Sequence, residues 1–199
     1  MPIQYSEPGP QVENAVRSSL QSLAARPASE LHALAGSAPA ELTMESPHEI
    51  FTLGLDQLST ATGLAEARAG GWRYLLRRGD LVVASAQTTF GTAGEPVFSM
   101  FNSGPFVAST AAAFTRAEGM GGAAGEAPLE PRLLHVPALH AMAVWLHGQD
   151  ATADVVLPLA PTPPTVDSDR QYSVEEYLAA LRDAAPRVDA VGVEDTTGG

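Results

Sequence analysis

The N-terminal part of the chain repeats apolar residues with the three- and four-residue spacing of an amphipathic helix. A first helix is predicted to open at Pro10, and a second, shorter helix to follow Pro27 with Leu31 and Leu34 facing inward. Residues 1–9 are rich in turn formers, and we expect them to be flexible. The apolar stripe of the first helix consists of Val12, Val16, Leu20 and Leu23.

A third helix is predicted over residues 47–59. Ser46 supplies a capping hydroxyl, Pro47 a residue favoured at the first helical position, and Glu49 the partner of a capping box. This assignment places His48 in the exposed first turn, where a functional role is not expected.

From Trp72 onward the period changes to the alternation typical of strands. Residues 72–78 and 81–89 are predicted to form a hairpin closed by Gly79 and Asp80. Simple pairing around this turn places Leu76 opposite Val83 and Tyr74 opposite Ser85.

The rest of the chain predicts four more strands and two more helices. One helix begins at Pro105, the stretch 119–125 reads as a glycine-rich loop, and Pro137 interrupts two strands. Ser173 and Glu176 form a capping box that opens the final helix. The predicted strands cover residues 97–101, 133–136, 139–147 and 155–159, and residues 186–199 are expected to form a disordered acidic tail.

This order of elements favours an α+β fold, because the strands follow one another with only one helix between them. We expect a mainly antiparallel sheet of about five to six strands, with N-terminal helices, one inserted helix and a C-terminal helix. Residues 10–185 are predicted to form a single domain.

The amino-acid composition argues against several classes of function. The formal net charge is -12, with 23 acidic residues against 11 basic ones, so nucleic acid and anionic membranes are not expected partners. The chain has no lysine and no cysteine, which excludes Schiff-base chemistry, thiolate nucleophiles and disulfides. The N-terminus lacks the pattern of a signal peptide, and the residue usage resembles GC-rich coding, so we expect a cytoplasmic bacterial protein.

The most informative junction for chemistry is the sequence Asn102, Ser103, Gly104, where a strand ends and a helix begins. Backbone N–H groups at a helix start attract anions, and Ser103 adds a hydroxyl that could donate a hydrogen bond or act as a nucleophile. The alternative is that Ser103 or Asn102 simply caps the helix.

Histidines and arginines supply the other candidates. His135 and His140 are candidate partners of Ser103 in catalysis, although their spacing, like that of His147, matches no metal site, and no metal or cofactor is expected. Arg73 and Arg77 are predicted to share one face of a strand and to bind a carboxylate or phosphate, unless they pair with neighbouring acids.

No complete catalytic set emerges from these residues. The leading hypothesis is therefore a non-enzymatic domain that binds a protein partner, a second copy of itself or a small anionic ligand. The alternative is a small hydrolase or transferase that uses Ser103 with a histidine.

Overall fold

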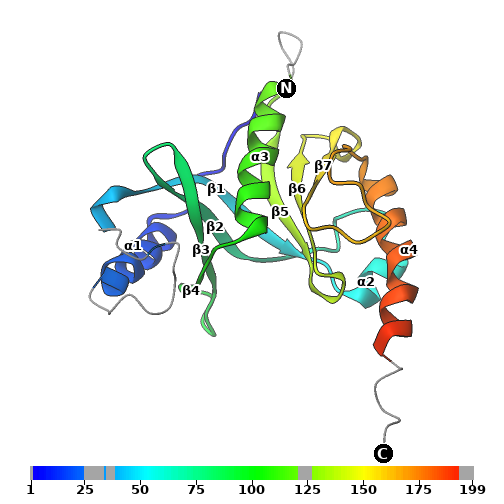
Figure 1. The fold of residues 1–199 in the computed structure, drawn as a ribbon, viewed down its shortest axis with the longest axis horizontal. Coiled ribbons are helices and arrows are strands. Elements are labelled where there is room, and N and C mark those ends of the chain that lie inside the picture. The colour runs from blue at the N-terminus through cyan, green and yellow to red at the C-terminus, as the bar shows by residue number, and fades with distance from the viewer. Residues whose placement is uncertain (1, 25–33, 35–38, 121–126, 193–199) are drawn as a thin grey trace, which may run out of the picture.

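The fold is a seven-stranded sheet with helices on both faces, seen in a computed structural model that describes residues 2–24, 34, 39–120 and 127–192 (Figure 1). The strand order is β4-β3-β2-β1-β5-β6-β7. The strands are β1 (Leu42–Thr52), β2 (Arg68–Arg78), β3 (Leu81–Phe90), β4 (Pro96–Asn102), β5 (Glu130–Val136), β6 (Ala141–His147) and β7 (Val155–Leu159). The helices of the described part are α1 (Pro10–Ala24), α2 (Leu55–Thr60), α3 (Pro105–Gly119) and α4 (Val174–Gly192), with three short 3-10 turns.

The sheet is antiparallel except where β1 runs parallel to β5, with Glu49–Thr52 alongside Arg132–His135. Helix α3 carries the chain from β4 at one edge back to β5, beside β1. The predicted α+β class with a mainly antiparallel sheet is confirmed. The sheet has more strands than the expected five to six, because residues 42–52 form a strand.

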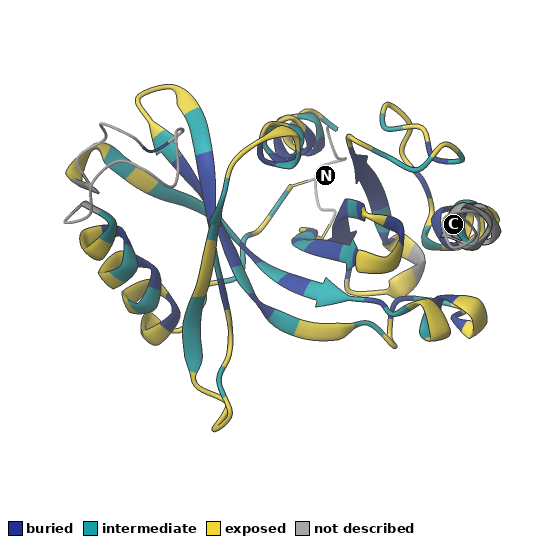
Figure 2. Cartoon of the chain, turned by 60° about the horizontal axis from the view of Figure 1, so that its bottom comes forward, coloured by how far each residue is buried: buried dark blue, intermediate teal, exposed yellow. Residues whose placement is uncertain are grey.

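Helix α3 covers one face of the sheet, and α1 and α4 cover the other face at opposite ends (Figure 2). Successive strand residues point to opposite faces, and Leu75 packs in the core that contains α3 while Tyr74 and Leu76 pack in the core that contains α1. In β5, Leu133 packs in the α3 core and Leu134 in the α4 core. The long helix α1 thus packs on the sheet, as its apolar stripe predicts.

The predicted helix over residues 47–59 is wrong, since only Leu55–Thr60 is helical. Residues 42–52 pair with β2 on one side and with β5 on the other. These two ladders outweigh the local capping signal. The register of β1 shifts between Glu45 and His48, and Ser46 has a φ of 49°, so Ser46 and Pro47 form a β-bulge instead of a helix start.

The hairpin closed by Gly79 and Asp80 is confirmed, but its register differs from the prediction. Arg77 pairs with Val82, whereas Leu76 pairs with Ala84 and Tyr74 with Ala86. A bulge therefore leaves Val83 as an extra residue in β3. Sequence pattern alone does not reveal a one-residue bulge, because the flanking residues on β3 are all small or apolar.

The two ends of the chain differ from the expectations in detail. Residues 2–4 have defined contacts: Ile3 bridges to Leu129, and the N–H of Gln4 donates to the Leu129 carbonyl at 3.0 Å. The capping box before α4 is confirmed by bonds in both directions between Ser173 and Glu176, at 3.0 and 3.2 Å. Helix α4 continues beyond the boundary set at residue 186, and 193–199 lie outside the described residues, so the disordered tail stays a prediction.

Two other predicted segments also fall outside the described residues, namely the helix after Pro27 and most of the glycine-rich loop. Of the helices that are described, none combines the length and apolarity that a membrane span requires.

Gly71 in β2 provides a direct test of this packing. Its φ is +131°, and a Cβ at this position would lie 2.0 Å from the Thr88 carbonyl oxygen of β3. Gly94 also has a positive φ of +82°, but a Cβ there has nothing within 4 Å. Gly71→Ala should therefore lower the free energy of unfolding by about 3 kcal/mol or more, and Gly94→Ala by only about 1 kcal/mol.

Urea denaturation followed by circular dichroism measures both effects. Equal losses for the two variants would show that β2 and β3 do not approach each other at Gly71 as described.

Candidate ligand-binding site

Three polar side chains are buried together on the α3 face of the sheet. His48, Arg73 and Ser85 have exposed fractions of 0%, 1% and 0%. His48 and Arg73 are direct partners across β1 and β2, and Ser85 pairs with Leu75, two residues along β2 from Arg73. Because paired residues share a face and Leu75 packs in the α3 core, all three side chains point toward α3.

The bulge in β1 is what turns His48 to this face. Glu45 pairs with Leu75 and His48 pairs with Arg73, so β1 uses three steps where β2 uses two. Without the extra residue, Pro47 would oppose Arg73 and His48 would point to the other face. The His48 ring then packs edge-on against Phe114 of α3, with ring centroids 5.0 Å apart.

Four polar atoms of this cluster lack hydrogen-bond partners. Nε and NH1 of Arg73, Nε2 of His48 and Oγ of Ser85 are all buried and unsatisfied. None of the ion pairs seen in the described part of the chain includes Arg73. A buried charge without a partner destabilises a fold by several kcal/mol, roughly 3–5 when a pair is broken. Such a group is consistent with a site for an external anion.

The protonation states of the two larger groups follow from burial. Burial lowers the pKa of Arg73 to about 10, so its guanidinium remains charged at neutral pH. Burial, and then the charge of Arg73, lowers the pKa of His48 from 6.5 to about 3, so its ring is neutral. His48 Nδ1 lies 2.6 Å from the Ser46 carbonyl oxygen, which fixes the proton on Nδ1 and leaves Nε2 as an acceptor.

The row of paired residues that contains Arg73 runs across β2, β3 and β4 to the edge of the sheet. Arg73 pairs with Gln87 of β3, and Gln87 pairs with Met100 of the edge strand β4. Gln87 is half-buried and Met100 is 46% exposed. Met100, two strands from Arg73, is therefore an exposed residue in this row, at the edge of the sheet.

The two candidate arginines have different environments. Arg77 donates to Glu45 Oε2 at 2.7 Å and to the Asp80 carbonyl at 2.8 Å. The alternative of pairing with neighbouring acids thus applies to Arg77, and its bond to Glu45, together with the charge of Glu45, raises the pKa of Arg77. Arg73 has the unsatisfied atoms that a ligand site requires.

The residues of the strand-to-helix junction differ in their burial and in their contact with the cluster. Asn102 is half-buried and pairs with Ser85, whereas Ser103 and Gly104 are exposed. Pro105 occupies the first turn of α3, as predicted, but the residue at the N-cap is Gly104, which has a φ of 110° and makes no side-chain cap bond. The structure therefore does not show Ser103 or Asn102 as a helix cap.

The histidines proposed for catalysis are not joined to Ser103. His135 lies half-buried on β5, where burial, and then the charges of Arg73 and His140, lower its pKa. His140 is exposed at the end of the turn Pro137–Leu139, with a φ of 49°. No hydrogen bond links Ser103 to a histidine in the described ranges, nor does any group of three or more potential metal ligands occur there.

His147 has a different role that the sequence did not reveal. Its Nδ1 lies 3.1 Å from Asp154, and the same buried carboxylate accepts bonds from Trp145 Nε1 at 2.7 Å and from the Gly148 N–H at 2.9 Å. Asp154 thus satisfies three donors and fixes the loop between β6 and β7. This arrangement is fully satisfied, which favours a structural role.

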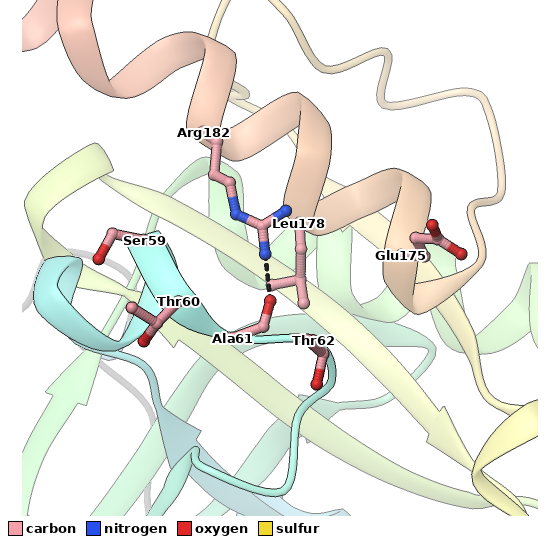
Figure 3. A pocket seen from close by; sticks show the side chains of 7 residues that line it. All are labelled: Ser59, Thr60, Ala61, Thr62, Glu175, Leu178 and Arg182. Atoms are coloured by element: carbon pink, nitrogen blue, oxygen red, sulfur yellow. Dashed lines mark hydrogen bonds between the residues drawn. The ribbon is translucent and has the colours of Figure 1, made fainter.

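A pocket lies between α2 and α4 (Figure 3). One of its two charged residues, Arg182, donates through Nε to the Leu58 carbonyl at 2.9 Å and through NH2 to the Ala61 carbonyl. These carbonyls lie at the end of α2, so Arg182 holds α2 against α4. The lining residues are Ser59, Thr60, Ala61, Thr62, Glu175, Leu178 and Arg182.

Comparisons of this chain with models of protein families, with curated proteins and with solved structures find no match. The candidate site is therefore defined by the chemistry of the buried cluster formed by His48, Arg73 and Ser85.

The buried state of His48 predicts a specific acid sensitivity. Its pKa is about 3 in the folded chain and near 6.5 when unfolded, so the unfolded state binds one more proton between these values. The stability that depends on neutral His48 is present above pH 6.5 and is lost as the pH falls toward 3, by about 1.4 kcal/mol per pH unit. The variant His48→Phe should show a correspondingly shallower loss.

Urea denaturation at a series of pH values between 7 and 4 measures these slopes, with His140→Phe as the control because it replaces an exposed histidine and keeps His48. Parallel curves for the wild type and His48→Phe would contradict the burial of neutral His48.

Proposed function

We propose that this chain is a non-enzymatic binding domain that recognises an anionic group through Arg73. The observation that carries the proposal is the buried guanidinium of Arg73, with Nε and NH1 unsatisfied and no carboxylate beside it among the described residues. A guanidinium presents its N–H groups in a planar arrangement that matches a carboxylate or a phosphate. The ligand would supply the charge that the protein itself does not.

The overall charge determines how such a site would work. With a net charge of -12, the chain repels anions at long range. At short range the low dielectric around a buried arginine strengthens charge-assisted hydrogen bonds. Binding is therefore expected to be selective for ligands that can enter the cluster, and weak for anions held only at the surface.

The anionic group can belong to a small ligand, to a protein partner or to a second copy of the chain, and a bacterial cytoplasmic setting is part of the proposal. In the row of the sheet that contains Arg73, the exposed residue Met100 lies on the edge strand β4. The enzymatic alternative has no comparable support, because Ser103 is exposed and forms no hydrogen bond with a histidine of the described residues.

The test is a binding titration of small anions at low ionic strength, with phosphate and acetate as probes. Arg73→Met removes the charge but keeps a similar length, and should weaken binding at least about tenfold, the effect of losing one charge-assisted bond. Arg77→Met is the matched control on the same strand. It should bind like the wild type, because Glu45 already neutralises Arg77.

NMR shifts of the backbone amides of His48, Arg73, Ser85 and Asn102 report on the location of binding. Shifts that persist in Arg73→Met, or that respond equally to the two arginine variants, would contradict a site at Arg73.

A further inference from the structure

The unsatisfied atoms of the buried cluster differ in kind. Arg73 Nε and NH1 can only donate hydrogen bonds, whereas His48 Nε2 can only accept one while its proton is held on Nδ1 by the Ser46 carbonyl. Ser85 Oγ can do either. A ligand that satisfies this cluster must therefore supply a hydrogen-bond donor as well as negatively charged acceptors.

The donor and the acceptor are close together. His48 and Arg73 are direct partners in an antiparallel ladder, and the Cα atoms of such partners lie about 4.5–5.5 Å apart. Both side chains point toward α3, so the donors of Arg73 and the acceptor of His48 lie on the same face of the sheet. A carboxylate or a fully deprotonated oxyanion offers only acceptors, and would place oxygen lone pairs against His48 Nε2.

We infer that the ligand of this site carries an O–H donor next to its anionic oxygens, as a 2-hydroxycarboxylate or a protonated phosphate does. The anionic oxygens accept from Arg73, and the hydroxyl donates to His48 Nε2. This inference rests on the proposed anion site at Arg73, and it goes beyond that proposal by assigning the selectivity to His48.

A selective site should discriminate strongly, because the wrong ligand leaves a buried polar atom unsatisfied. Two pairs of probes differ in the donor while keeping the charged group similar. Glycolate has the hydroxyl that acetate lacks, and hydrogen phosphate has the O–H that sulfate lacks near neutral pH. The preferred member of at least one pair should bind about tenfold or more tightly.

Calorimetric or NMR titrations of the intact chain with all four anions separate the outcomes. A preference for glycolate assigns a hydroxycarboxylate ligand, and a preference for hydrogen phosphate assigns a phosphate ligand. Equal binding within both pairs overturns the inference and leaves the anion site in place. No binding of any of the four anions overturns the anion site as well.

The variant His48→Phe keeps an aromatic ring against Phe114 but removes the acceptor. In the pair of anions that the wild type discriminates, this variant should bind both members with equal affinity. That affinity should be about the affinity of the wild type for the anion without the O–H donor. His140→Phe is the control, since it replaces an exposed histidine and keeps the acceptor of His48, and it should preserve the ratio. A ratio that is unchanged in His48→Phe overturns the role of His48.

A spectroscopic measurement on the wild type keeps the test independent of the folding of that variant. The 15N shift of His48 Nε2 should move on addition of the preferred anion and stay unchanged with its donor-free counterpart. Equal shifts with both would overturn the inference.

Discussion

Strand β1 is the element on which the rest of the structure depends, because it is the strand that joins the two halves of the sheet. The antiparallel strands β2, β3 and β4 extend from one side of it, and β5, β6 and β7 extend from the other. Its pairing with β5 is parallel, and helix α3, which carries the chain from β4 to β5, packs over the middle of the sheet. The register of β1 thus sets both what lies under α3 and which side chains face it.

The bulge at Ser46 and Pro47 has a chemical consequence as well as a geometric one. It brings a histidine, opposite a buried arginine, to a face where most neighbouring residues are apolar. Burial, and then the charge of Arg73, keep His48 neutral, and the Ser46 carbonyl in the bulge fixes its tautomer. A cluster of this kind reduces stability unless a ligand supplies the missing hydrogen-bond partners.

Local signals were sufficient for those elements whose stability is local. The helix opened by Pro10, the capping box at Ser173 and the turn at Gly79 all follow from neighbouring residues and agree with the structure. The assignment of β1 failed because Ser46 and Glu49 imitate a helix start, and only pairing with β2 and β5 decides otherwise. Tertiary contacts of this type are not encoded in a short window.

The candidate site could also be predicted only in part from the sequence. Arg73 and Asn102 could be proposed from the sequence, Arg73 as one of two arginines on the same strand face and Asn102 as part of a strand-to-helix junction. The ion pair that engages Arg77 could not be predicted from the sequence, because its partner Glu45 lies 32 residues away. Nor could the burial of His48 and Ser85, which depends on two bulges that each shift the register by one residue.

The most direct test of the account is the free energy of unfolding of Arg73→Met compared with that of the wild type, measured without any added anion. If Arg73 is an uncompensated buried charge kept for a ligand, the methionine variant should be the more stable, by about 1 kcal/mol or more. A variant that is less stable than the wild type by several kcal/mol would show that Arg73 is satisfied within the fold, and would contradict the claim that it awaits an anion.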